Sequence, residues 1–569
     1  MFHFIHTYTG NSFEGLIKNG LWHAGDGLKI MHKPYYPAQY RFNDFYGENS
    51  ALFALLKELD CIFYIDRLQG GIGLPFWYDY DNGLLKKYGE MLGDKFWGFQ
   101  MHEWASNRSS DCKRIKAALN EFEKNNPGAS TAVFWKNAVA KAEKGEADIF
   151  TEAHTVKEWS NLRLPLTLNE FIDDCNELWE KRKSLVNAPL FPADSFYMAP
   201  RLEIAHGAKR LMPECGWQIP DMRIQLAYTR GMARAAGIPF GIYYECWCAQ
   251  NDKGLTIPYA CDDYRNEWRE DELLGEINER SKSRPEMGGS SRSLQERAWL
   301  YAYFCGADAL GEEYGVCNTF CNYRDFELSE YGLVKKKFLD FTQKYPDPGE
   351  PFTPFAVVLP QETEMLSINE PDENYLSYPV SALGAGFAEK IRNVRKTLGF
   401  LLTDKDCGAK RLGSESHVLQ NGAYPDVFDI IHGDMKEAVK RYRYLIDLTG
   451  DAAFASQNAA KTVTVGEIPA LLKNTVPVIP DKPVHYLFNT VPGGYLMLIL
   501  NENGVNRLDF KGDVLLKDAF VKTEITPAAF ADFGAGYLAG SGKLTAENGK
   551  FYAQLNAGEW LLLSITNNI

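Results

Sequence analysis

The chain has 569 residues, more than one hydrophobic core usually supports, so we expect two or three domains. Hydrophobic residues make up 45% of the sequence and charged residues 24%, the balance of a soluble globular protein, and no apolar run reaches the roughly 18 residues of a membrane span. The net charge of −14, without any basic block, argues against nucleic acid as a partner.

Short apolar strands alternate with helical stretches from the start of the chain to about Tyr345. This rhythm predicts an α/β fold built on a (β/α)8 TIM barrel over residues 1–348, with a helical insertion at 105–194. The eight strands are expected at Phe2–Tyr8, Leu28–His32, Cys61–Asp66, Phe96–Glu103, Phe196–Pro200, Arg210–Cys215, Pro239–Glu245 and Ala307–Gly311.

A segment rich in proline and glycine, Tyr345–Gly349, ends the barrel. We then expect residues 349–462 to form an α/β layer, with strands near Pro354–Leu359, Val427–Ile431 and Tyr444–Leu448. From residue 463 to residue 569 the helical signal weakens. Apolar or alternating runs between Gly/Asn turns there predict a C-terminal all-β domain, a β-sandwich.

Two of the barrel strands end on a glutamate beside tryptophan: Glu103 precedes Trp104, and Glu245 lies two residues before Trp247. Barrel enzymes place their chemistry at the carboxyl ends of their strands. Hydrolysis of a glycosidic bond needs one carboxyl group to protonate the leaving oxygen and another to trap the oxocarbenium-like centre. We therefore predict Glu103 and Glu245 as a catalytic pair, against the alternative that each pairs with a nearby arginine or caps a helix.

The stretches Gln100–Trp104 and Ile242–Trp247 resemble the motifs of clan A glycoside hydrolases. The resemblance implies a retaining mechanism with Glu103 as acid/base and Glu245 as nucleophile. The order of domains is similar to that of the family 42 β-galactosidases, which implies a flavodoxin-like middle domain that supports homo-oligomers and a β-galactoside-like substrate. The clan usually has asparagine before the acid/base residue, whereas this chain has His102, which indicates a distant or separate family.

Other polar and aromatic residues near the predicted strand ends are candidates for binding substrate. Glu214 is the main rival for a catalytic role, and one of the adjacent Glu312 and Glu313 is expected to face the barrel mouth while the other makes an ion pair. Substrate binding, by hydroxyl recognition or sugar stacking, is further assigned to His32, Asp66, Arg67, His102, Trp104, Arg201, Glu214, Trp217, Trp247 and Glu312.

The sequence leaves two other functions open. One is a carbohydrate-binding barrel without catalysis, and the other is a metal-assisted hydrolase using His6, His32 and carboxylates. No cofactor is expected, because the pairs Cys246/Cys248 and Cys317/Cys321 lack partners for a tetrahedral metal site.

The cysteines and the N-terminus bear on the cellular compartment. Eleven cysteines scattered in mostly apolar runs indicate reduced, buried thiols, and Met1–His6 shows no signal-peptide pattern. We expect a cytoplasmic protein acting on a glycoside or oligosaccharide, with no membrane partner. A secreted protein whose signal peptide had been removed would look the same.

Overall fold

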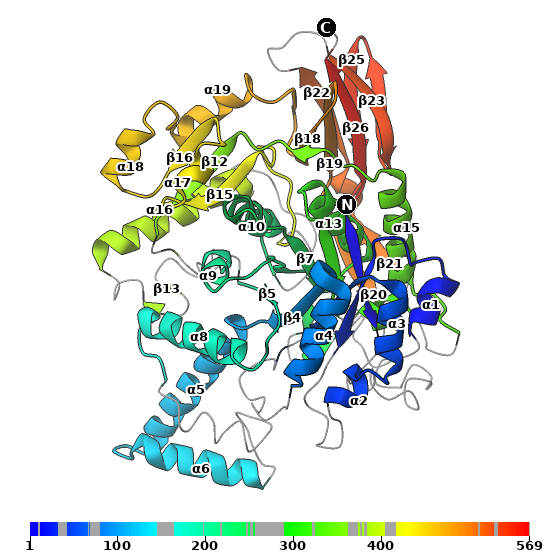
Figure 1. Cartoon of the computed structure of the whole chain (residues 1–569). Coiled ribbons are helices and arrows are strands. Elements are labelled where there is room, and N and C mark those ends of the chain that lie inside the picture. Colours follow the sequence, from blue (N-terminus) through cyan, green and yellow to red (C-terminus); the bar gives the residue numbers. More distant parts are fainter. Residues whose placement is uncertain are drawn as a thin grey trace. The chain divides into compact units, whose positions relative to one another are not determined.

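The computed structural model describes most of the chain, and Figure 1 traces it. The described residues are 1–8, 12–31, 42–66, 68, 80–144, 164–196, 199–216, 219–245, 248–250, 254–256, 290–313, 315–320, 325–361, 363, 374–375, 378–379, 384–403, 417–509, 512–527 and 533–567. Among them, no helix is both long enough and apolar enough to cross a bilayer.

The chain divides into two compact units. Unit 1 comprises Met1–Gly27, Arg210–Glu364 and Gly384–Ile569, and unit 2 comprises Leu28–Lys209 and Met365–Leu383. These two units do not correspond to the three domains expected from the sequence. The boundaries of those domains stay a prediction.

An eight-stranded sheet carries the predicted barrel topology, in the order β5-β4-β3-β2-β1-β10-β7-β6. Its pairings β3–β4, β4–β5, β1–β10, β10–β7 and β6–β7 are all parallel. Parallel strands joined through helices are the defining feature of a (β/α)8 barrel, so the predicted fold class is confirmed.

Unit 1 contributes four of these strands and the helices that follow them. Gly237 caps the C-terminal end of helix α10, and its φ of 67° is a left-handed conformation that glycine adopts without strain. The bounds are β1 (His3–Tyr8), α1 (Ser12–Lys18), β6 (Glu214–Gly216), α10 (Met222–Ala236), β7 (Gly241–Glu245), β8 (Cys248–Gln250), β9 (Gly254–Thr256), α13 (Arg292–Phe304), β10 (Ala309–Glu312), α14 (Gly315–Thr319) and α15 (Glu330–Lys344).

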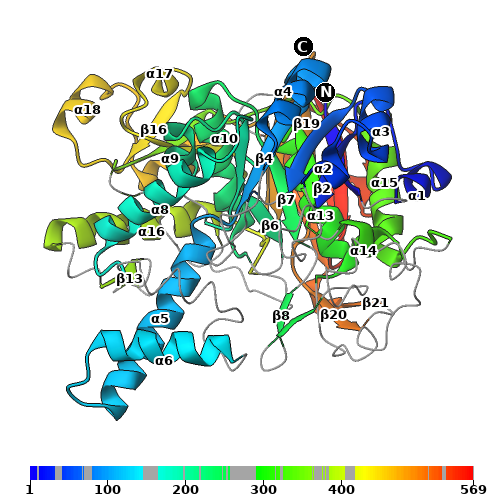
Figure 2. The ribbon, with the colours of Figure 1, turned by 60° about the horizontal axis from the view of Figure 1, so that its bottom comes forward.

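Unit 2 contributes the other four barrel strands and a helical pair, α5 and α6, labelled at the lower left of Figure 2. The bounds are β2 (Gly27–Met31), α2 (Phe42–Tyr46), α3 (Ala51–Leu59), β3 (Ile62–Asp66), α4 (Asn82–Leu92), β4 (Phe96–His102), α5 (Ser106–Asn125), α6 (Thr131–Glu143), α8 (Leu168–Lys183), β5 (Leu190–Ala193), α9 (Pro200–Ala205), β13 (Asn374–Tyr375) and β14 (Tyr378–Pro379).

The fifth barrel strand is not where the sequence analysis placed it. It is Leu190–Ala193, whereas Phe196–Pro200 was expected. Pro200 instead opens helix α9, because its fixed φ suits the first helical turn and its missing N–H has no helical partner there. Strand β5 contains Pro192, and proline is rare inside strands because it has no N–H to donate to a neighbouring strand.

The predicted α/β layer is a parallel sheet in the order β15-β12-β16 within unit 1. Helix α10 packs against β15, and Gly231 permits this because a Cβ there would overlap the Ile430 backbone. The bounds are β11 (Glu350–Pro351), β12 (Phe355–Leu359), α16 (Ala385–Leu402), β15 (Phe428–His432), α17 (Lys436–Val439), β16 (Tyr444–Asp447), α18 (Ala452–Gln457) and α19 (Ile468–Leu472).

The C-terminal part of unit 1 consists mainly of antiparallel strands, as the sequence predicts, but the strands begin at Val478, after the short helix α19. One antiparallel sheet has the order β11-β18-β19-β26-β23, a second has the order β17-β22-β25-β24, and β20 pairs with β21. The bounds are β17 (Val478–Pro480), β18 (His485–Val491), β19 (Gly494–Leu500), β20 (Val505–Asp509), β21 (Gly512–Leu515), β22 (Val521–Pro527), β23 (Phe533–Gly540), β24 (Lys543–Glu547), β25 (Lys550–Leu555) and β26 (Trp560–Asn567).

Candidate active site

Three buried glutamates from neighbouring barrel strands of unit 1 bring their carboxylates together. Glu214 lies in β6, Glu245 is the last residue of β7, and Glu313 directly follows β10. Each offers a carboxylate oxygen, and these three atoms lie within 4.8 Å of one another. Their exposed fractions are 2%, 1% and 3%, so little water screens the charges.

Strand pairing explains why these three side chains meet. Gly216 of β6 is in register with Glu245, and the Glu313 amide donates a hydrogen bond of 2.9 Å to the Tyr244 carbonyl oxygen. On β6, the Gln225 side chain from α10 donates a 2.6 Å hydrogen bond to the Glu214 carbonyl oxygen. These contacts fix the backbone at all three glutamates, and a fixed backbone is part of the pre-organisation that a catalytic site needs.

The electrostatic effect of this cluster reaches its neighbours. Burial raises the pKa of the Cys215 thiol well above its ordinary value, and the charge of Glu245 adds to that rise. Carboxylates this close repel one another when all are ionised, so a proton, a cation or a developing positive charge between them is stabilised. The same three oxygens are also of the type that bind Mg²⁺ or Ca²⁺.

Gly216 leaves the space that the Glu245 side chain occupies. A Cβ at position 216 would overlap Cγ and the carbonyl oxygen of Glu245 and would lie 3.0 Å from its Cδ. Any side chain at this position must therefore displace the carboxylate of Glu245. No local sequence signal marks Gly216, because its role depends on the β6–β7 register.

Gly216→Ala is expected to lower kcat by about 100-fold, because a displacement of about 1 Å at a reacting group costs that much. The matched control is Gly89→Ala in α4, where a Cβ meets no atom within 4 Å and turnover should be unchanged. Kinetics and thermal unfolding of both variants make the measurement. Wild-type turnover in Gly216→Ala would contradict the role of this glycine.

Glu103 lies at the end of β4 in unit 2, as the sequence predicts. Its φ of 43° is unusual for a residue with a side chain, and such conformations concentrate at functional sites. The Glu103 amide donates to the Ala193 carbonyl oxygen at 2.6 Å, and one of its carboxylate oxygens lies 3.3 Å from His102 Nε2. The Glu103 side chain is 27% exposed and therefore reachable from solvent.

A buried aspartate holds the turn that carries Glu103. Asp194, which follows β5, accepts hydrogen bonds from the amides of Ala105 at 2.8 Å and Phe196 at 2.9 Å. Burial raises the pKa of Asp194, and the charge of Glu103 contributes to this shift. Strand β5 therefore positions this turn through Asp194, the residue that follows it.

The structure distinguishes the adjacent glutamates after β10. Glu312 is fully buried and makes an ion pair of 2.6 Å with Lys335, and Asn318 Nδ2 donates to it at 2.9 Å. Glu313 joins the carboxylate cluster. One of the two glutamates thus makes an ion pair, and it is Glu312, whose expected contact with substrate stays a prediction.

Two of the other described candidates, Asp66 and Trp104, have partners within unit 2. Asp66 is fully buried, with a carboxylate oxygen 3.7 Å from Lys29 Nζ. Trp104 is also fully buried and donates a hydrogen bond of 3.2 Å to Glu203. Arg201 is half-buried on α9. The remaining candidates, His32, Arg67, Trp217 and Trp247, lie outside the described residues.

His6, the described histidine of the metal-assisted alternative, is fully buried with its Nε2 3.1 Å from Asp26 Oδ2. Burial, followed by the positive charge of Lys335, lowers the pKa of His6 despite this carboxylate. Asp26 also accepts a hydrogen bond from the His23 amide at 2.8 Å. The imidazole is therefore engaged in a buried His–Asp pair.

Comparison with known proteins gives structural likeness without sequence support, since no family profile and no curated protein matches the chain. An alpha-L-fucosidase isoenzyme 2 from Paenibacillus thiaminolyticus has 8% identity and a TM-score of 0.41, covering 99% of this chain and 97% of that one. A catalytic mutant of Gan42B, a GH42 beta-galactosidase from G. stearothermophilus, has 7% identity and a TM-score of 0.47, with coverages of 99% and 98%. A GH42 exo-carrageenase from Bacteroides ovatus has 11% identity and a TM-score of 0.32, with coverages of 100% and 80%. The likeness to these glycoside hydrolases concerns the fold alone and carries no argument about activity.

Proposed function

We propose that this protein is a retaining glycoside hydrolase in which Glu245 is the nucleophile and Glu103 the general acid/base. The observation that carries the proposal is the buried carboxylate cluster of Glu214, Glu245 and Glu313 on adjacent barrel strands. A pre-organised negative field favours the positive charge that develops at the anomeric carbon as the glycosidic bond breaks.

The reaction proceeds in two displacements. The Glu245 carboxylate attacks the anomeric carbon while the carboxylic acid of Glu103 protonates the departing glycosidic oxygen, which leaves a glycosyl ester on Glu245. Glu103, now ionised, removes a proton from water, and the resulting hydroxide attacks the anomeric carbon and releases Glu245. Two inversions give net retention, and we extend the proposal to a β-galactoside-like substrate.

Glu214 and Glu313 assist without forming a covalent bond. Both carboxylates accept hydrogen bonds only, which suits them to bind sugar hydroxyl groups beside the anomeric carbon. Glu214 is also the rival for the role of acid/base, because it shares the cluster with Glu245.

Azide rescue tests the assignment of the acid/base. With an activated aryl glycoside found by screening, Glu103→Ala should form glycosyl-enzyme readily and hydrolyse it slowly, and azide should restore turnover by about 10- to 100-fold because it needs no general base. The glycosyl azide should have the configuration of the substrate. Glu214→Ala is the matched comparison, and rescue of that variant instead of Glu103→Ala would transfer the role to Glu214.

The same preparations test the non-catalytic alternative. A carbohydrate-binding barrel would bind oligosaccharide with unchanged affinity after Glu245→Gln and would hydrolyse no glycoside. Turnover that persists in the presence of EDTA would separate the proposed mechanism from a metal-assisted one.

A further inference from the structure

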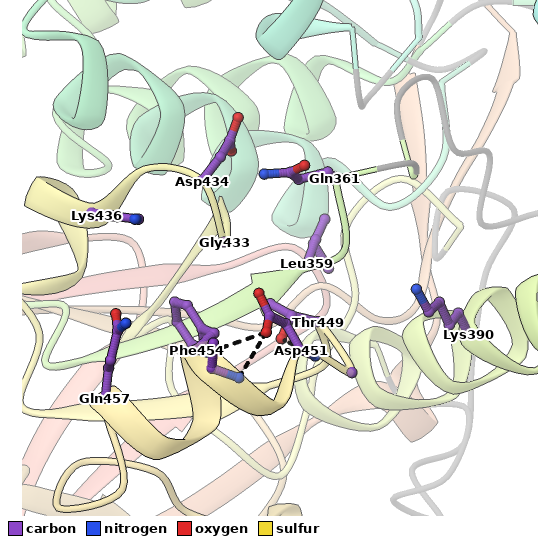
Figure 3. Close-up of a pocket in the computed structure, with 12 residues that line it drawn as sticks. Leu359, Gln361, Lys390, Gly433, Asp434, Lys436, Thr449, Asp451, Phe454 and Gln457 are labelled. Atoms are coloured by element: carbon purple, nitrogen blue, oxygen red, sulfur yellow. Dashed lines mark hydrogen bonds between the residues drawn. The ribbon is translucent and has the colours of Figure 1, made fainter.

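A cavity of about 380 Å³ opens at the carboxyl edge of the three-stranded sheet β15-β12-β16. None of the three clustered glutamates lines it, and they belong to a different sheet. Its walls come from the segments that follow each of the three strands, together with helix α16. Figure 3 shows Asp434 and Gln361 on one side of it and Thr449, Asp451 and Phe454 on the other.

The topology of the sheet marks this edge as a place for a ligand. In chain order β12 comes first, β15 pairs on one side of it and β16 on the other, so the connections reverse direction between β12 and β16. Open α/β sheets bind ligands in the crevice that such a reversal creates at the carboxyl ends of the strands. A volume of this size is at the lower end of the range of small-molecule sites.

The wall after β16 is held in place before any ligand arrives. Thr449 donates a hydrogen bond of 2.7 Å from its hydroxyl to Asp447, and the Asp451 amide donates one of 3.0 Å to the same hydroxyl. Asp451 Oδ1 in turn accepts hydrogen bonds from Ala453 N at 2.8 Å and Phe454 N at 3.3 Å. Among the described residues no hydrogen bond reaches Asp451 Oδ2.

The charges that line the cavity are balanced and favour neither an anionic nor a cationic ligand. Lys390 and Lys436 are balanced by Asp434 and Asp451. A phosphate would also meet the carboxylate of Asp451 at the amino end of α18, where phosphate-binding sites present open backbone N–H groups. A cationic ligand would meet two ammonium groups. A neutral ligand avoids both penalties.

The remaining lining suits a ligand rich in hydroxyl groups. Carboxylates accept and ammonium groups donate, whereas the amides of Gln361 and Gln457 do both, and each sugar hydroxyl needs both kinds of partner. Phe454 also lines the cavity and is 7% exposed, which leaves a small apolar surface for the C–H face of such a ligand. We propose that this cavity is a binding site for a neutral monosaccharide, a site that does not depend on hydrolysis at the barrel.

The test is calorimetric titration of the full chain with D-galactose, D-glucose, D-mannose and L-fucose, and with glucose 6-phosphate as the anionic comparison. Ala453→Trp should fill the cavity, because Ala453 is an exposed residue of its lining, and should weaken sugar binding by about tenfold or more. Ala452→Trp is the matched control: Ala452 is exposed on the same helix but is not part of the lining, so affinity should stay within about twofold.

Reductive methylation of wild-type protein, read by mass spectrometry, gives a second measurement that needs no variant. Bound sugar should protect Lys390 and Lys436 relative to the exposed Lys517. Binding that is lost in Ala453→Trp and retained in Ala452→Trp, with lysine protection, supports the proposal. Three results would overturn it: no binding of any of the four sugars, preference for the phosphorylated sugar, or binding that survives Ala453→Trp and is lost in Glu245→Gln. The last would assign the sugar to the barrel and leave the proposed hydrolysis intact.

Discussion

Replacing Glu245 with glutamine is expected to lower kcat by about four orders of magnitude on an activated aryl glycoside. The amide is nearly the same size as the carboxylate but cannot attack the anomeric carbon, so the covalent step is lost while the packing against Gly216 is kept. Steady-state kinetics with an assay sensitive enough to exclude contaminating wild-type enzyme makes the measurement.

Glu313→Gln is the matched control for this variant, since it changes the same chemical group within the same cluster. Its kcat should fall by about 100-fold or less, because an amide still donates and accepts hydrogen bonds and only the local charge is lost. Circular dichroism should show both variants folded. Turnover of Glu245→Gln within about tenfold of wild type would remove the nucleophile assignment.

Replacing His485 with glutamine is expected to lower the free energy of unfolding by about 3–5 kcal/mol near pH 6, because it breaks a buried ion network. His485 lies between two buried carboxylates, with Asp426 and Glu502 oxygens each 2.7 Å from its ring nitrogens. Arg223 on α10 contacts Asp426 at 2.6 Å, and Arg297 on α13 contacts Glu502. Without the imidazolium, one positive charge is missing from the centre of this network.

The pH dependence of this effect follows from the pKa shifts. Burial alone would lower the pKa of His485, but Asp426 and Glu502 raise it above its usual value of about 6.5. Its contribution to stability is therefore complete below that value and is lost as the pH rises through the raised pKa. Burial opposes ionisation of both carboxyls, but Arg223 and His485 lower the pKa of Asp426, and Arg297 and His485 lower the pKa of Glu502. The contribution of these carboxylates is therefore lost only as the pH falls through the lowered pKa values.

Urea-induced unfolding of wild type and His485→Gln at several pH values checks both parts of this prediction. The difference in free energy should be largest near pH 6 and should shrink at alkaline pH. Lys522→Gln, which removes an ion pair of 2.7 Å with Glu547 on the exposed surface, is the control and should change little. A difference that stays constant from about pH 6 to pH 10 would show that charge on His485 does not stabilise the fold.

Much of the barrel could be predicted from local sequence, because a buried parallel strand is a continuous apolar run. The runs ending at Glu103 and Glu245 correctly predict strands β4 and β7. The run at Phe196–Pro200 misled because apolar residues around a proline also begin helices. Local periodicity does not distinguish these two cases.

The arrangement of the site could be predicted only in part, because it depends on register between distant strands. Glu313 joins Glu245, and Glu312 does not, because of two distant contacts. Strand β10 pairs with β7, and Glu312 makes an ion pair with Lys335, 23 residues further along the chain. The space under Glu245 depends on Gly216, which lies across the β6–β7 pairing. Neither partner is marked by a local motif.

Covalent trapping tests the central claim most directly. A 2-deoxy-2-fluoro glycoside with a good leaving group slows both displacements, and the second one most, so the glycosyl ester accumulates on the nucleophile. Digestion and mass spectrometry should then find the added sugar mass on Glu245. A label on Glu214 or Glu313, or turnover of the parent glycoside with inversion and no label, would contradict the proposed mechanism.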